Sequence, residues 1–262
     1  MNKSKGTPKP LDRGDQNSNK TSSQQKTSKK RPLSANTLST LQEAGFRLGK
    51  TIGVGSYSCV RLAYNLKTNI SKNQLVACKI INKEKASEKF LSRFLPRELN
   101  ILKTLNHPHI IKVINMFTLG PRLFVFMNYC SHGDLLDYIR DHGHFKEDNA
   151  KLLFRQLVDA LKYLHSHHIA HRDLKCENIL LGGKGDTLTL TDFGFSRYFF
   201  SGRSELSTTF CGSAAYAAPE IIEGIAYDPL FGDIWSLGCV LFIMITASMP
   251  YDDSNIPTMV EY

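Results

Sequence analysis

The chain has 262 residues, of which 42% are hydrophobic and 22% charged, an ordinary composition for a soluble globular protein. Its formal net charge is +9. Residues 1–40 carry nine Lys or Arg against two Asp, whereas the other 222 residues carry 24 basic and 22 acidic side chains. The basicity therefore belongs to one end of the chain, which argues against nucleic-acid binding by the folded body.

Residues 1–40 are rich in Ser, Thr, Lys, Asn and Gln and nearly free of large apolar side chains. Such a segment buries too little surface to offset the entropy of ordering it, so it is predicted to be a disordered basic tail. Its KKRP stretch (29–32) could be a nuclear address or a phosphate-binding patch, although a solvated linker is favoured. Nucleic-acid binding through this tail stays an alternative, and it would depend steeply on salt.

Three features bear on the compartment. No apolar stretch follows Met1, so no secretory signal is visible. The six cysteines are scattered without a CxxC pair, which favours free thiols in a reducing cytosol. The apolar run at 237–247 is 11 residues long, too short to span a bilayer, and it predicts a buried core helix. We expect a cytoplasmic protein, with a nuclear pool left open by KKRP, and neither a membrane nor a nucleic-acid partner.

The front part of the chain predicts strands. From Phe46, apolar residues alternate with polar ones in segments broken by GVGS and by the loop at 65–74, which indicates antiparallel strands. A helix is predicted to start at Pro96, because proline is favoured in the first turn of a helix, and to end at 106–108. Two more strands follow at 110–117 and 122–129.

The back part of the chain is predicted to be mostly helical. Helical spacing covers 134–143 and 149–167, a small hairpin is expected at 180–192, and a buried helix surrounds Trp235. A cleft between a strand-rich part and a helical part is a natural ligand site.

Two motifs of the front part suggest phosphate binding. In IGVGSYSCV (52–60), Gly53 and Gly55 would let the backbone approach a phosphate closely, although a plain hairpin turn explains the same stretch. Ser58 stands where a G-x-G-x-x-G pattern has its third glycine. VACK (76–79) puts Lys79 among apolar neighbours, where burying an unpaired ammonium is costly. Glu98 is the expected partner, and two solvent-facing charges are the alternative.

The stretch HRDLKCENIL (171–180) gathers charged and amide side chains in one predicted loop. Asp173 could accept the proton of a hydroxyl, Asn178 could bind a divalent metal, and Lys175 could neutralise a phosphate. DFG (192–194) adds the carboxylate of Asp192, which suits Mg²⁺, and AAPE (217–220) closes the segment that follows.

In this order and on these elements, the motifs resemble those of protein kinases from roughly Phe46 to the C-terminus. The resemblance implies an α+β, bilobal fold with an antiparallel β N-lobe that carries one main helix, and a mostly helical C-lobe. The catalytic domain would cover 41–262, with an N-lobe at 41–127, a hinge at 128–133 and a C-lobe at 134–262. ATP and Mg²⁺ would be the cofactors, and protein substrates would receive the phosphate.

The resemblance also implies residue roles. Asp173 would be the catalytic base, Lys175 would balance charge on the γ-phosphate, and Asn178 and Asp192 would hold the metal. Lys79, paired with Glu98, would hold the α- and β-phosphates. The residues implied in nucleotide binding are Ile52, Gly53, Val54, Gly55, Ser56, Val60, Ala77, Lys79, Glu98, Met127, Asn128, Cys130 and Asp134.

Further likeness concerns the kinase class. Lys175 and Ser213 resemble serine/threonine rather than tyrosine kinases. The stretches FLPRELNILKTLNHPHII, HRDLKCENILL and STTFCGSAAYAAPE are most similar to testis-specific serine kinases, in the calmodulin-dependent and AMP-activated-like branch. Cys176, where most kinases have proline, is one of the sharper cues. A role in sperm development and a chaperone partner would follow.

Regulation is implied as well. Arg172 resembles the arginine of kinases whose activation segment is ordered by phosphorylation, with Thr209 as the candidate phosphosite and an upstream kinase as partner. Glu177 could favour a basic residue on the substrate. Asp233 would hydrogen-bond the backbone of the HRD stretch.

The main alternative to an active enzyme follows from the C-terminal part of the sequence. Kinase domains normally continue with more helices, including an arginine that pairs with the glutamate of APE, here Glu220. The C-lobe is therefore expected to be incomplete at its C-terminus, with apolar surface left open. A truncated kinase-like binding module or scaffold without catalysis is the alternative to an active enzyme.

Overall fold

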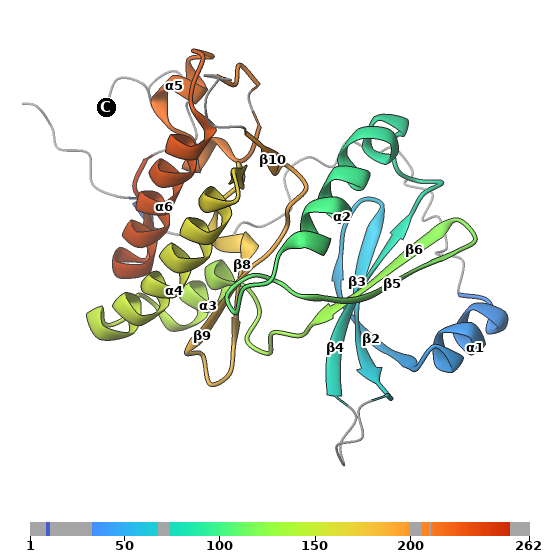
Figure 1. The fold of residues 1–262 in the computed structure, drawn as a ribbon. Coiled ribbons are helices and arrows are strands. Elements are labelled where there is room, and N and C mark those ends of the chain that lie inside the picture. The colour runs from blue at the N-terminus through green and yellow to red at the C-terminus, as the bar shows by residue number, and fades with distance from the viewer. Residues whose placement is uncertain (1–8, 11–32, 68–73, 200–205, 210, 252–262) are drawn as a thin grey trace, which may run out of the picture. The chain divides into compact units, whose positions relative to one another are not determined.

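The computed structural model describes residues 9–10, 33–67, 74–199, 206–209 and 211–251 (Figure 1). The chain forms two compact units. The sheet unit comprises Asp12–Ala86 and Val113–Tyr129, and the helical unit comprises Met1–Leu11, Ser87–Lys112 and Cys130–Tyr262. An antiparallel sheet in one unit and helices in the other confirm the predicted α+β class.

Five antiparallel strands build the sheet unit, in the order β2-β3-β4-β6-β5. Alternation along each strand puts one face of the sheet into a core, where the rings of Phe46 and Phe126 stack with centroids 4.0 Å apart. The strands are β2 (Phe46–Val54), β3 (Ser58–Asn65), β4 (Gln74–Asn82), β5 (Val113–Leu119) and β6 (Arg122–Asn128).

A helix that the sequence did not predict packs on this core. The helix α1 (Ala35–Glu43) is capped by Ser34, whose Oγ accepts a hydrogen bond from the backbone of Thr37, and it buries Leu41 beside Phe46. The prediction that residues 1–40 form a disordered tail is therefore wrong at residues 35–40. It is also wrong at β1 (Lys9–Pro10), which pairs with β11 (Ser248–Met249). Residues 1–8 and 11–32, including KKRP, lie outside the described residues.

The helical unit is built around two long helices that lie side by side, α4 (Glu147–Ser166) and α6 (Pro229–Thr246) (Figure 1). The predicted hairpin at 180–192 is confirmed by the pairing of β8 (Ile179–Gly182) with β9 (Thr187–Leu190). The other elements are α2 (Leu95–Thr104), α3 (Leu135–His142), β7 (Ile169–Ala170), β10 (Arg197–Tyr198), α5 (Pro219–Ile222) and short 3₁₀ turns at Cys176–Asn178 and Ala214–Tyr216.

The helix around Pro96 differs from its prediction in two ways. A π-helical segment, Phe90–Phe94, leads directly into α2, so helical structure begins before the proline rather than at it. A π-helical turn is wider than an α-helical one, and in it the backbone N–H of Leu95 donates to the carbonyl of Phe90. This turn accommodates Pro96, which has no backbone N–H to donate. In addition, α2 belongs to the helical unit, whereas it was expected inside an N-lobe at 41–127.

Helix α6 is longer than the apolar run that predicted it. With 18 residues and a mean hydropathy of 1.7, it is long and apolar enough to cross a membrane by those two criteria alone. The core helix of a water-soluble domain meets the same criteria. Asp233, 1% exposed, lies inside α6 and accepts hydrogen bonds from the backbone of the HRD stretch (171–173), so we assign α6 to the core of the helical unit.

Candidate active site

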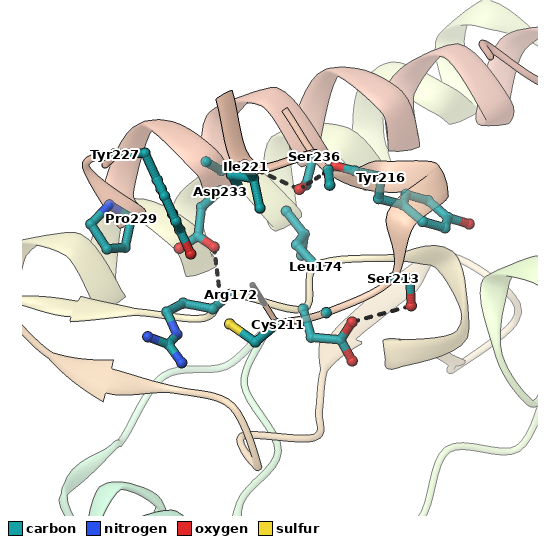
Figure 2. A pocket seen from close by; sticks show the side chains of 14 residues that line it. Arg172, Leu174, Cys211, Ser213, Tyr216, Ile221, Tyr227, Pro229, Asp233 and Ser236 are labelled. Atoms are coloured by element: carbon teal, nitrogen blue, oxygen red, sulfur yellow. Dashed lines mark hydrogen bonds between the residues drawn. The ribbon is translucent and has the colours of Figure 1, made fainter. Parts of the chain in front are cut away.

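The HRD stretch follows β7, whose pairing with β10 fixes its start. Arg172 has a φ of +66°, a left-handed conformation that costs a non-glycine residue about 1–3 kcal/mol. The backbone N–H groups of His171 and Arg172 each donate a 2.8 Å hydrogen bond to the carboxylate of Asp233, as predicted. Figure 2 shows the bond between Arg172 and Asp233. Hydrogen bonds to a charged acceptor stabilise this conformation, so Asp233 is a positioning residue.

The imidazole of His171 is fully buried and structural. Its Nε2 donates to the carbonyl of Thr191 over 3.1 Å, and its Nδ1 lies 3.4 Å from the backbone nitrogen of Asp173. The ring meets Phe193 edge to face, with centroids 5.1 Å apart. The histidine thus ties the HRD stretch, the candidate catalytic loop, to the segment that carries DFG.

Three polar side chains converge on Asp173, which is 8% exposed. Its Oδ2 lies 3.2 Å from Nζ of Lys175 and accepts a 3.0 Å hydrogen bond from Nδ2 of Asn178. Its Oδ1 accepts a hydrogen bond of 3.3 Å from Oγ of Ser213, and Lys175 donates to the same Oγ over 2.9 Å. The ammonium and the two hydrogen bonds from Asn178 and Ser213 hold the carboxylate in one orientation with its charge compensated.

The amide of Asn178 is also oriented. Both hydrogen bonds of its Nδ2 go to Asp173, one to the carboxylate and one of 2.8 Å to the backbone carbonyl. This leaves the amide oxygen as the acceptor that can ligate a cation. Asp192 supplies an exposed carboxylate from a backbone with φ +63°, and its Oδ1 accepts a 3.3 Å hydrogen bond from Gly194. Amide and carboxylate oxygens are the ligands that Mg²⁺ prefers, so these residues fit the predicted metal.

Glu98 lies near the DFG glycine, although the two are 96 residues apart in the chain. A Cβ placed on Gly194 would be 3.9 Å from Oε2 of Glu98 and 3.3 Å from Oδ1 of Asp192. Glu98 is 5% exposed and comes from the first turn of α2. The helical unit therefore brings this predicted residue to the DFG stretch.

A small cavity lies between the catalytic loop, α6 and the stretch CGS (Figure 2). Gly212 has a φ of +91°, and a Cβ there would stand 2.6 Å from the carbonyl oxygen of Arg172, so only glycine allows this approach. Next to it, burial raises the pKa of the Cys211 thiol, and Arg172 partly opposes that rise. The close contact between Gly212 and the carbonyl of Arg172 brings the next residue, Ser213, within hydrogen-bond distance of Asp173.

An acidic residue, Glu177, is hydrogen-bonded to the wall of this cavity. Glu177 is exposed and accepts a 3.2 Å hydrogen bond from Oη of Tyr216. Asp134, half-buried, has its pKa raised mainly by burial and further by the negative charges of Asp137 and Glu177. The pKa of the Tyr216 hydroxyl is raised by burial, so it stays a donor to Glu177.

Three other arginines lie near enough to Arg97 to act on it electrostatically. Burial lowers the pKa of Arg97, and the positive charges of Arg197, Arg93 and Arg172 lower it further. Such a gathering of cations suits a phosphate. Thr209 is exposed, and its carbonyl accepts a 3.1 Å hydrogen bond from Tyr227, which also lines the cavity with Arg172.

In the sheet unit, the glycine-rich stretch is the turn between β2 and β3. Gly53 lies opposite Val60, and the N–H of Gly55 donates to the carbonyl of Ser58 over 2.9 Å. A Cβ on Gly55 would be 3.0 Å from Oγ of Ser58, which requires glycine or a shift of the serine. Ser58 itself begins β3, so the hairpin does not need a third glycine there. Ile52 and Val54 are exposed on either side of Gly53.

Lys79 and its neighbours form one patch on the sheet. Lys79 lies opposite Val60 on β3 and Val125 on β6, and Ala77 lies opposite Met127. Residues directly opposite each other, and residues two apart on one strand, share a face. Four predicted residues, Val60, Ala77, Lys79 and Met127, therefore share the face opposite the core that packs against α1.

The predicted hinge at 128–133 and Asp134, which follows it, fall on both units. Asn128 ends β6 in the sheet unit, whereas Cys130 and Asp134 belong to the helical unit. Burial raises the pKa of the Cys130 thiol. Asp134 caps α3 by accepting a 2.9 Å hydrogen bond from the backbone of Asp137, a structural role that its implied part in nucleotide binding did not include.

The predicted site residues thus form two sets. The helical unit joins Asp173, Lys175 and Asn178 in one hydrogen-bonded cluster, and the sheet unit gathers the glycine-rich turn and the face of Lys79. Sequence reasoning used Ser213 only as a mark of kinase class and missed its two bonds in the cluster. It also missed the arginines around Arg172, because no local pattern connects α2, the HRD stretch and β10.

Comparisons with known proteins agree with this geometry. A family model described as "Protein kinase domain" matches residues 46–261. Testis-specific serine/threonine-protein kinase 3 of Mus musculus is 49% identical over 216 residues, which are 82% of this chain and 78% of the relative. Testis-specific serine/threonine-protein kinase 1 of Homo sapiens is 48% identical over 223 residues, 84% and 59% of the two chains. Serine/threonine-protein kinase SIK2 of Gallus gallus is 40% identical over 214 residues, 82% of this chain and 26% of the relative.

Proposed function

Since the chain belongs to the protein kinase family, among its serine/threonine members, we propose that it transfers the γ-phosphoryl group of ATP to Ser and Thr hydroxyls of proteins. One observation carries the proposal. The carboxylate of Asp173 is held by Asn178 and Ser213 and compensated by Lys175. A carboxylate fixed in this way can orient a hydroxyl and accept its proton, and the ammonium can balance charge on the transferred phosphate.

We propose ATP and Mg²⁺ as the cofactors. The oriented amide oxygen of Asn178 and the exposed carboxylate of Asp192 would hold the metal, which supplies neutralising charge on the phosphate oxygens. Lys79 and the glycine-rich turn at 52–58 would bind the phosphates, with Glu98 as the partner of Lys79. The adenine would lie against Ala77 and Met127, with Asn128 and Cys130 as backbone partners.

The biological role is proposed from the relatives. Their names call them testis-specific, which supports a role in sperm development for this chain. We propose that an upstream kinase phosphorylates Thr209 and that a chaperone assists folding. The cytoplasm is the proposed compartment, with a nuclear pool as an extension.

The test is phosphate transfer by the full chain to a generic basic serine peptide, with ATP and Mg²⁺. Asp173→Asn should lower the rate about 10²–10⁴-fold, the usual contribution of a positioned proton acceptor. Lys79→Met, made in the same host, controls for co-purifying kinases. Asp186→Asn, in the exposed turn between β8 and β9, is the matched control and should leave the rate unchanged.

Two outcomes would contradict the proposal. Folded wild type that binds ATP but transfers no phosphate would instead identify a kinase-like binding module. Transfer that survives Lys79→Met and Asp173→Asn would come from a contaminant. Thermal melting of each variant separates lost chemistry from lost fold.

A further inference from the structure

We propose that the outward side of α6 is an interface on which a second copy of this chain docks, with the two α6 helices antiparallel about a two-fold axis. The inference goes beyond phosphate transfer and does not depend on it. It uses apolar side chains for which the candidate active site has no role.

Seven residues of α6 form this surface, which we call the α6 face. They are Gly238 and the residues three, four and seven positions to either side of it: Phe231, Ile234, Trp235, Leu241, Phe242 and Ile245. At 3.6 residues per turn, all of them lie within about 60° of Gly238 around the helix. Each of the seven is exposed or partly exposed. The opposite side of the helix, with Asp233, Val240 and Ile243, is buried.

The α6 face leaves a large apolar area open to water. Phe231 is 69% exposed, Ile234 51% and Ile245 46%. Because a phenylalanine can bury about 150–250 Å², Phe231 alone leaves roughly 100–170 Å² open. The whole face then offers roughly 500 Å², near the upper end of the largest apolar patch on typical monomers. Two copies would bury about 1,000 Å² together, the lower limit for a specific interface, so the dimer should be weak.

The order of residues along α6 suits a second copy of the same helix. When two identical helices pack antiparallel about a two-fold axis at Gly238, each residue meets the one equally far on the other side. Phe231 would therefore meet Ile245 of the second copy, and Ile234 would meet Phe242. Large apolar side chains face each other at every such pair, and glycine faces glycine at the axis.

The centre of the α6 face permits close approach without repulsion. A Cβ on Gly238 would meet nothing within 4 Å, so packing inside one chain does not require glycine there. The distance between two packed helices depends on the side chains at their crossing, and glycine makes it short. Of the 18 residues of α6, only Asp233 is charged, and it is buried against the HRD stretch. Two α6 faces therefore bring no like charges together.

Trp235 shows independently that the face is incomplete in a single chain. Its indole Nε1 is buried and has no hydrogen-bond partner among the described residues. A buried tryptophan N–H usually has such a partner. The ring stacks on Tyr251, with centroids 5.9 Å apart, and both residues line a groove along α6. A second copy seated on this groove would supply the missing acceptor.

The experiment measures the oligomeric state of the full chain by sedimentation velocity. We expect a monomer–dimer equilibrium with a dissociation constant in the micromolar range, as for other small interfaces. Gly238→Lys and Gly238→Glu should each raise this constant at least about 100-fold, because two like charges would meet at the axis. An equimolar mixture of the two variants should form dimers again, since Lys then faces Glu. Leu152→Lys, at an exposed apolar position of α4, is the matched control and should dimerise like wild type.

Four results would overturn the inference. Wild type could stay monomeric at about 100 μM, a concentration at which a micromolar dimer is mostly formed. Gly238→Lys could leave the dimer unchanged, or the mixture of Lys and Glu variants could stay monomeric, which would exclude the two-fold arrangement. Monomeric wild type that binds phosphatidylcholine vesicles, with the binding lost in Gly238→Lys, would identify a membrane surface as the occupant.

Thermal melting of the variants is the check on the fold. The open space around Gly238 leads us to expect that Gly238→Lys melts within a few degrees of monomeric wild type at low concentration. A much lower melting temperature would mean that residues of the same chain cover the α6 face, and it would also overturn the inference.

Discussion

The backbone N–H of Arg172 donates a 2.8 Å hydrogen bond to Oδ1 of Asp233, which comes from the interior of α6. Arg172 keeps a left-handed backbone, with φ +66°, immediately before Asp173. Since that conformation costs about 1–3 kcal/mol, it persists only where neighbouring groups over-determine it. The buried carboxylate supplies this constraint and thereby fixes the direction in which Asp173 leaves the backbone.

Asp233→Ala should therefore destabilise the protein and abolish phosphate transfer. Two backbone donors lose a charged acceptor, and each such hydrogen bond contributes about 1.5–3 kcal/mol. Urea unfolding should show a loss of roughly 3 kcal/mol or more in the free energy of unfolding. Glu223→Ala, at an exposed position, is the control and should change this free energy by less than about 0.5 kcal/mol. An unchanged unfolding midpoint for Asp233→Ala would refute the role of Asp233.

Gly212→Ala should remove activity through one steric contact. The new Cβ would stand 2.6 Å from the carbonyl oxygen of Arg172 and 3.3 Å from Oδ1 of Asp173, so the stretch carrying Ser213 must move away. The rate of phosphate transfer should fall at least about 10²-fold, because a misplacement near 1 Å costs that much. The measurement is the initial rate on a basic serine peptide.

Gly224→Ala is the matched control for Gly212. Gly224 also has a positive φ, +73°, but a Cβ there meets nothing within 4 Å. It should lose about 1 kcal/mol of stability from backbone strain and keep its activity. Equal loss of activity in both variants would show that strain, rather than the contact with Arg172, is responsible.

The surroundings of His107 lead us to expect that the free energy of unfolding depends on pH. Its ring stacks on Tyr163 with centroids 5.0 Å apart, and its Nδ1 accepts a 3.2 Å hydrogen bond from the backbone of His109. The pKa of His107 is lowered by burial and then by His109, while Asp159 opposes the shift. The folded protein thus favours the neutral ring. Below about pH 6.5 the unfolded chain binds more protons than the folded chain, so the free energy of unfolding should fall as pH decreases.

The measurement is urea unfolding at pH 7.5 and pH 5.5. His107→Gln should flatten the pH dependence relative to wild type, because the group that titrates differently in the two states is gone. His142→Gln removes an exposed histidine of α3 and should keep the wild-type slope. A wild-type protein that gains stability on acidification, with the gain lost in His107→Gln, would reverse the assigned direction.

Sequence patterns predicted the structure correctly where it depends on residues close together in the chain. Alternation predicted the strands that carry Val60 and Lys79, and the hairpin at 180–192 followed from its glycines and alternating residues. Glycine spacing marked the turn at Gly55, and the structure has a hairpin turn there, between β2 and β3. These features depend on residues within a few positions of each other.

Prediction failed where the structure depends on contacts between residues far apart in the chain. In α1, six of the nine residues are polar and only Leu38 and Leu41 are large and apolar, so its stability comes from the core that receives Leu41. Ser213 meets Asp173 across 40 residues because Gly212 packs on Arg172, a contact that no periodicity encodes.

Leu41→Ala should test whether α1 is part of the folded sheet unit. Leu41 is 1% exposed among Phe46, Phe126 and Val76, whereas Leu38 on the same helix is 43% exposed. Deleting a buried leucine side chain costs about 2–5 kcal/mol, so Leu41→Ala should lower the free energy of urea unfolding by that amount. Leu38→Ala, the control, should cost less than about 1 kcal/mol. Equal small effects would mean that α1 is not packed on the core in solution.

We expect Thr209→Ala to transfer phosphate more slowly than fully phosphorylated wild type, whereas Thr208→Ala should keep the wild-type rate. Both threonines are exposed, but the carbonyl of Thr209 is held by Tyr227 in the wall of the cavity that contains Arg172. A phosphate on Thr209 would pair with arginines there, and such charge-assisted hydrogen bonds contribute about 1.5–3 kcal/mol, so the transfer rate should fall roughly 10- to 100-fold without them. The measurement is transfer rate against phosphate occupancy by mass spectrometry. Full activity of Thr209→Ala, or a loss confined to Thr208→Ala, would assign the activating phosphate elsewhere.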